Sequence, residues 1–109
     1  MNKEKIKLVL RKIINWLLKE EYHKVFQNDN AKLLTQDEIK TSINEYPGNL
    51  TLPPDEGFKG IELYEIDDNE IAFDFDLWFN NEKSDLTLSG RMINYNGVVK
   101  YSLENIHVL

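Results

Sequence analysis

The most constraining feature of this sequence is the segment 71–79, in which large apolar side chains alternate with other side chains. Apolar residues stand at every odd-numbered position, and the even-numbered positions hold Ala72, Asp74, Asp76 and Trp78. A period of two is typical of a β-strand, because successive side chains point to opposite faces of a sheet. We therefore expect a strand with one face packed in the core and the other face in water or against a partner.

Three more segments have strand character, so that the predicted strands are 60–66, 70–79, 85–95 and 98–108. Asn96-Gly97 predicts a two-residue hairpin turn, since both central positions of a type I′ turn need positive φ. Placing Tyr95 opposite Val98 then pairs Gly90 with Leu103 on the packed side. The four strands are expected to form an antiparallel meander.

The hairpin formed by the predicted strands 70–79 and 85–95 is expected to have a longer connection, at 80–85. Placing Phe79 opposite Leu86 brings Asp74 beside Arg91, an opposite-charge pair on the outer side of the sheet. The same register puts Phe75 beside Gly90, where an aromatic ring covers the glycine. Both hairpins agree about which side chains point inward.

The N-terminal part of the chain is predicted to be helical. Apolar residues at helical spacing predict one long helix at about 3–27. A second helix at about 36–46 begins with a capping box, in which Thr35 and Glu38 each bond the other's backbone amide. Pro47-Gly48 ends it, and residues 47–59 are expected to be an extended connection. The predicted fold class is α+β, a single domain over 1–109 with two N-terminal helices packed on the meander.

Composition excludes several classes of function. The 109 residues include no Cys, which rules out disulfide scaffolds and Cys-ligated metal sites. The net charge of −6 argues against nucleic acid as a partner, because phosphate binding needs clustered Lys and Arg. No apolar run is long enough to cross a membrane or to form a secretory signal. We expect a cytoplasmic protein without metal or cofactor, as a monomer or a homodimer.

Charge is distributed unevenly along the chain. Residues 1–40 carry 9 basic and 6 acidic groups, net +3, whereas residues 41–109 carry 4 basic and 13 acidic groups, net −9. Between Glu62 and Asp76 there are seven acids and no base. Such a run can simply be a solvated surface, or it can steer a basic partner to the protein.

The candidate partner-binding residues are the acids of the predicted outer face and one aromatic residue among them. Trp78 shares the face of Asp74 and Asp76, and tryptophan is common at the centre of interfaces. The structural alternative is that the segment around Pro53-Pro54 covers this indole. The complete predicted set is Asp67, Asp68, Glu70, Asp74, Asp76, Trp78 and Asp85.

No catalytic motif supports an enzyme. The sequence has no Gly-x-Ser-x-Gly turn, phosphate-binding glycine loop or His-Glu-x-x-His pattern. Asp74 and Asp76 could form a cation site or a hydrolytic pair, but their spacing is that of the ordinary polar side of a strand. One alternative is a ligand-binding or enzymatic cup lined by Trp16, Tyr64, Phe73 or Tyr101. A further alternative is an accessory domain that dimerises through a sheet edge.

Five short segments resemble a family of small acidic bacterial domains of unknown function, and the resemblance spans nearly the whole chain. They are Leu34–Ile39, Leu52–Asp55, Asp76–Trp78, Ser84–Leu88 and Ile106–Leu109. The size, charge and architecture are also similar to those of immunity proteins, which block bacterial toxins by covering the active site. This likeness carries over no catalytic residue. It implies a non-enzymatic, immunity-type inhibitor whose acidic sheet face binds and blocks a basic toxin domain.

Overall fold

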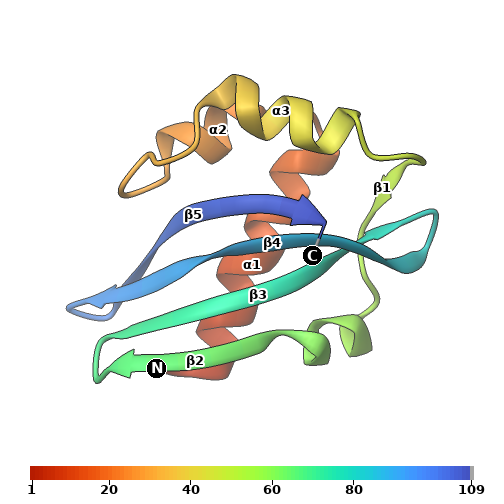
Figure 1. Ribbon diagram of the computed structural model, residues 1–109. Coiled ribbons are helices and arrows are strands. Elements are labelled where there is room, and N and C mark those ends of the chain that lie inside the picture. Colours follow the sequence, from red (N-terminus) through yellow and green to blue (C-terminus); the bar gives the residue numbers. More distant parts are fainter. Residues whose placement is uncertain (109) are drawn as a thin grey trace.

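The structure is a computed structural model that describes residues 1–108. In chain order its elements are α1 (Lys3–Leu18), α2 (Tyr22–Gln27), α3 (Gln36–Asn44), β1 (Leu50–Thr51), the 3₁₀ helix η1 (Asp55–Gly60), β2 (Glu62–Asp67), β3 (Glu70–Phe79), β4 (Glu82–Tyr95) and β5 (Val98–Val108). An antiparallel five-stranded sheet lies in front of α1, with α2 and α3 beyond β5 (Figure 1). The α+β class is therefore confirmed.

The sheet is a meander with one addition. β3, β4 and β5 are neighbours in sequence order, and two strands share the other side of β3. β2 pairs with the first half of β3, as in Leu63 opposite Phe73, and β1 pairs with its end, where Leu50 lies opposite Phe79. The prediction of four strands thus missed β1, which is too short to show a period.

The core lies between α1 and one face of the sheet, here called the inner face. The alternation in β3 is confirmed, since its odd-numbered side chains are buried and its even-numbered ones are half-buried. From α1, Leu10, Ile13 and Ile14 are fully buried against this face. Burying a side chain of this size stabilises the fold by about 2 kcal/mol. The opposite face, here called the outer face, is left uncovered by α1, α2 and α3 (Figure 1).

The predicted long helix 3–27 is wrong, because the chain turns between α1 and α2. Glu20 has φ of +58°, and the amides of Glu20 and Glu21 donate to the carbonyls of Leu17 and Trp16. These two bonds form a Schellman motif, which satisfies the last carbonyls of a helix. Glycine is the usual residue at the left-handed position, so a glutamate there gave no signal. The second predicted helix is confirmed in kind, as α3, with both bonds of its capping box present.

The connection at 47–59 is more regular than expected, since it contains β1 and most of η1. Phe58 in η1 is buried and stacks on Phe75, with 5.7 Å between the ring centroids. Arg11 of α1 lies over the Phe58 ring and pairs with Asp55. These contacts join η1 to both the helix and the sheet.

The predicted register of β3 with β4 is wrong by four residues at the turn and by two residues beyond Asp76. Asn80 and Asn81 both have positive φ and form a two-residue turn, so Phe79 lies opposite Glu82 and not Leu86. A bulge then shifts the pairing between Asp76 and Trp78. A slip of an even number of residues leaves the paired side chains on their predicted faces and changes only their neighbours, except within the bulge.

The β4–β5 register is confirmed from Tyr95 opposite Val98 to Gly90 opposite Leu103, and it shifts by one residue between Gly90 and Ser89. The ring beside Gly90 is that of Phe73 and not Phe75. A Cβ added at Gly90 would lie 2.4 Å from the carbonyl oxygen of Ser102. Glycine is therefore required here by the close approach of β5.

Candidate protein-binding surface

The outer face presents two carboxylates that are fixed by neighbouring hydroxyl groups. Ser89 Oγ donates to Asp74 Oδ1 at 2.6 Å, and Thr87 Oγ1 donates to Asp76 Oδ1 at 2.7 Å. Lys83 Nζ lies 3.5 Å from Asp76 Oδ2. Both carboxylates remain half-buried and not sealed. Side chains held in one position lose less conformational entropy when a partner binds.

Arg91 takes a different place from the one predicted. It lies opposite Ser102 on β5 and Ala72 on β3, so the predicted pair of Asp74 with Arg91 is wrong. Its guanidinium is 3.3 Å from Glu70 Oε2 and 3.6 Å from Glu104 Oε2. Asp74 is consequently free of any ion pair within residues 1–108.

Trp78 is half-buried, and η1 covers one side of its indole. A Cβ at Gly57 would lie 3.0 Å from Trp78 Cζ2 and equally far from Pro53 Cβ. The contact agrees with the alternative in which this segment packs on the indole. Trp78 therefore lies at the border of the outer face, with its indole only partly exposed.

The remaining predicted residues divide between two other places. Asp67 and Asp68 lie at the β2–β3 turn, where Asp67 Oδ1 accepts from the Asn69 amide at 2.8 Å. Asp85 is not on the outer face, since it accepts a hydrogen bond from Tyr46, just after α3. The bulge between β3 and β4 turns this part of β4 toward the helices. The outer face thus gathers Glu70, Asp74 and Asp76 of the predicted acids.

Tyr64 is an aromatic residue of the outer face that the predicted set missed. It lies opposite Ala72, is 48% exposed, and donates to Glu62 Oε2 at 2.6 Å. This hydrogen bond raises the pKa of Tyr64 to about 12, because the carboxylate disfavours the phenolate. Glu62 in turn lies opposite Asp74, which extends the acidic surface to the edge of the sheet. The alternation of Glu62, Leu63 and Tyr64 was the signal that could have placed both residues.

The four residues suggested as the lining of a ligand-binding cup do not surround one cavity. Phe73 is buried in the core, and Tyr64 lies on the other side of the sheet. Trp16 and Tyr101 do border one hollow, of about 480 Å³, between α1 and β5. Lys12 and Lys100 also line this hollow. The Tyr101 hydroxyl already donates a hydrogen bond to the Val25 carbonyl oxygen, at 2.6 Å.

Comparison with known proteins gives a family and no activity. The family described as a domain of unknown function (DUF7668) matches residues 14–109. No curated protein and no solved structure matches the chain. Within the described residues, no helix is long and apolar enough to cross a membrane, and no three His, Cys, Asp or Glu side chains are grouped to hold a metal ion.

Proposed function

We propose a function for this chain, which belongs to the DUF7668 family of domains of unknown function: it is a non-enzymatic module that binds a basic protein through the outer face. The observation that carries the proposal is the pair Asp74 and Asp76, held by hydroxyl groups on a sheet face that α1, α2 and α3 leave uncovered. Ordered carboxylates at the centre of a face are suited to charged partners whose side chains are also fixed.

The surrounding charge supports a basic partner. The β2–β3 hairpin contributes seven acids and no base between Glu62 and Asp76. Among residues 1–108, two cations are paired with these acids, Lys83 at Asp76 and Arg91 at Glu70. A surface of one sign attracts an oppositely charged protein and speeds its association, more than it raises the final affinity.

The finer form of the proposal is inhibition. A small acidic module that covers the active site of a basic toxin needs a rigid docking face and no catalytic groups of its own. The outer face supports this form because its strands belong to a continuous sheet backed by α1. If it is right, an equimolar amount of the chain abolishes the activity of the partner.

The test compares two double variants of equal charge change. Proteins captured on the immobilised chain are identified by mass spectrometry, purified and titrated against each variant by calorimetry. Asp74→Lys with Asp76→Lys reverses the outer face and is expected to weaken binding about 100-fold, since two like-charge contacts replace two favourable ones. Glu20→Lys with Glu45→Lys changes exposed acids on the helical side and leaves the affinity within about threefold.

A folding control accompanies the charge reversal, because both aspartates accept hydrogen bonds. Asp74→Asn with Asp76→Asn keeps the shape and removes only the charges, and it is expected to weaken binding about tenfold. Thermal unfolding verifies that each variant is folded. Affinity for the purified partner that is unchanged in the reversed variant would refute the proposal.

A further inference from the structure

Strand β2 has a free edge. β2 pairs only with β3, and within residues 1–108 its other side meets no strand. Five of its six residues are exposed, including the large side chains Tyr64 and Ile66. A strand edge of this kind presents unpaired N–H and C=O groups, which can accept one more strand. We refer to the unpaired side of Glu62–Asp67 as the β2 edge.

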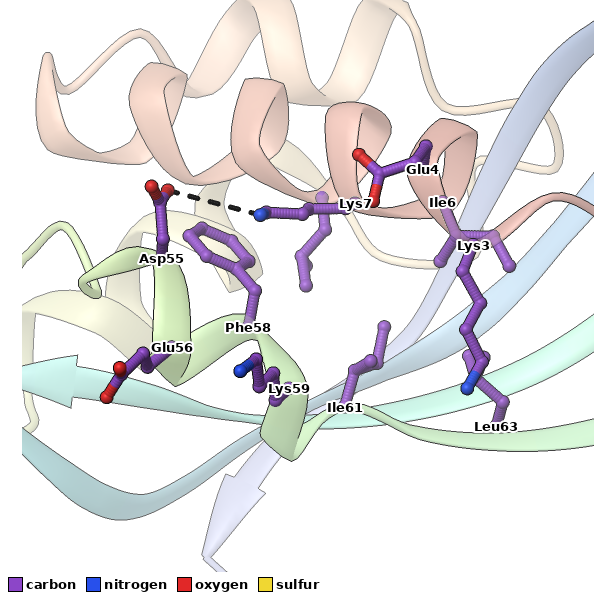
Figure 2. Close-up of a pocket in the computed structure, with 11 residues that line it drawn as sticks. Lys3, Glu4, Ile6, Lys7, Asp55, Glu56, Phe58, Lys59, Ile61 and Leu63 are labelled. Carbon is purple, nitrogen blue, oxygen red and sulfur yellow. Dashed lines mark ion pairs between the residues drawn. The ribbon is translucent and has the colours of Figure 1, made fainter.

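An apolar groove runs beside the β2 edge. It lies between the first turns of α1 and the chain from η1 into β2, and its volume is about 370 Å³. Ile6 and Leu10 form one wall, and Phe58, Ile61 and Leu63 form the other. Figure 2 shows Ile6 on the helix facing Ile61 and Leu63 across the gap, with Lys3 at one end. The size is in the range of small-ligand and side-chain pockets.

At the other end of the groove, the Asp55 carboxylate is already engaged by two cations. Lys7 lies 4.0 Å from Asp55, and Arg11 also pairs with this carboxylate. The hydrogen bond from Arg11, together with the charge of Lys7, lowers the pKa of Asp55. Phe58 closes the groove below this cluster (Figure 2). The stretch between Ile6 and Leu63 is apolar and adjoins the backbone of β2, and charged side chains of Lys3, Glu4, Glu56 and Lys59 lie around it.

We propose that the β2 edge and this groove bind an extended segment of the partner, which adds to the sheet as a sixth strand. Main-chain bonds to β2 supply affinity, and alternate side chains of the segment point to the two sides of the sheet. On the inner side they enter the groove between Ile6 and Leu63, so they are apolar. On the outer side they lie beside Glu62 and Tyr64, so they are basic. The inference rests on the proposed function, because it takes the partner to be a protein.

Charge favours such a segment over a second copy of this chain. Glu62, Glu65 and Asp67 are exposed along the β2 edge, and two copies would bring these acids together. Like charges opposite one another destabilise a strand pair, and charged edges are a common protection against self-association. A segment of alternating basic and apolar residues meets no such repulsion.

The test uses a defined probe, an end-blocked heptapeptide Lys-Val-Lys-Leu-Lys-Val-Lys, titrated into the isotope-labelled full chain. Binding is expected to shift the backbone amides of β2 and the methyl groups of Ile6, Ile61 and Leu63. It is also expected to slow hydrogen exchange at the β2 amides, since they gain partners. The same peptide with alternate backbone amides methylated has equal charge, and it is expected to bind about tenfold more weakly because it cannot complete the ladder.

Two variants of equal charge examine the edge itself. Glu62→Lys with Glu65→Lys is expected to weaken peptide binding about tenfold, whereas Glu20→Lys with Glu45→Lys leaves it within about threefold. Equal binding of the methylated peptide, or shifts confined to β4 and β5, would overturn the proposal. So would a dimer in light scattering whose protected amides are those of β2, because the edge would then be occupied by a second copy.

The outcome is separable from that of the proposed function. If the peptide does not protect β2 while Asp74→Lys with Asp76→Lys still abolishes partner binding, only the added strand is refuted. If the peptide protects β2 while that double variant retains full affinity for the partner, the outer face is refuted as the docking surface and the edge remains.

Discussion

The two edges of the sheet differ sharply, and the difference indicates which edge the chain itself covers and which edge a partner can reach. At the β5 edge, Asp29 is 1% exposed, and its carboxylate accepts from the amides of Ala31, Lys32 and Leu103. The Asn30 amide also donates to the Tyr101 carbonyl. The segment around Asp29 thus covers the middle of the β5 edge in place of another strand.

The β2 edge has no comparable cover. Its charged residues are exposed, and among residues 1–108 none of its backbone groups bonds to a neighbour beyond β3. One edge is covered by a segment held by a buried carboxylate, and the other carries exposed carboxylates. Stability should therefore depend on the β5 side and binding on the β2 side, which the following substitutions can test.

The largest loss is expected from Asp29→Ala. The change leaves the buried amide of Leu103 without an acceptor and releases the loop from the β5 edge. We expect the free energy of unfolding to fall by about 3 kcal/mol, measured by urea denaturation. Hydrogen exchange should become faster at Leu103 and its neighbours. Asp68→Ala, at the exposed β2–β3 turn, is the control and should change stability by less than about 0.5 kcal/mol. Equal effects of the two substitutions would remove the distinction between the edges.

A pair of glycine substitutions gives the next largest contrast. Gly90→Ala places a methyl group 2.4 Å from the Ser102 carbonyl oxygen of the neighbouring strand β5. We expect a loss of about 2 kcal/mol, because neither backbone can move away without breaking the ladder. Gly60→Ala, at the end of η1 beside β2, meets no atom within 4 Å. It should be neutral or stabilise the protein by about 0.5 kcal/mol. Thermal unfolding compares the two, and a tolerated Gly90→Ala would contradict the packing described for the β5 side.

The same contrast explains how much the sequence could predict. The alternation in 71–79, the capping box at Thr35 and the Asn96-Gly97 turn are local signals, and all three predicted the structure correctly. The break at Glu20 was missed because it places a non-glycine residue at positive φ. The Asn80-Asn81 turn was missed because a longer loop gives the same faces.

The candidate surface was predictable only in part. Alternation placed Asp74, Asp76 and Trp78 on one face, but their partners depend on the register and on the bulge beside Trp78. For the same reason Asp85 was assigned to the wrong side. The groove at the β2 edge depends on how α1 lies across the sheet, which no local pattern of the sequence specifies. Local patterns in the sequence thus predict which face of a strand a side chain occupies. Sites between two elements can be located only when the packing of those elements is known.

Alkaline pH should lower the stability of the fold through Tyr101, on the β5 side of the sheet. Burial, together with the charge of Asp29, raises the pKa of its phenol above the ordinary value of about 10. The unfolded chain therefore releases this proton first, and stability is complete below about pH 10 and falls as pH rises above it. Tyr101→Phe should cost about 1.5 kcal/mol at neutral pH, because the Val25 carbonyl loses its donor. It should also flatten part of the alkaline decline in urea denaturation. An unchanged alkaline slope would show that Tyr101 does not carry it.

The smallest effect on stability is expected at the open edge, where Tyr64 donates to Glu62. Glu62→Gln removes the carboxylate that disfavours the phenolate, so the pKa of Tyr64 should fall from about 12 toward its ordinary value. The free energy of unfolding should hardly change, because both side chains are exposed. Carbon-13 NMR of the tyrosine ring follows this titration, and Glu65→Gln on the same strand is the matched control. If Tyr64 titrates identically in Glu62→Gln and in the unaltered chain, the two side chains do not interact in solution. A large loss of stability in Glu62→Gln would instead show that the β2 edge contributes to the fold as the β5 edge does.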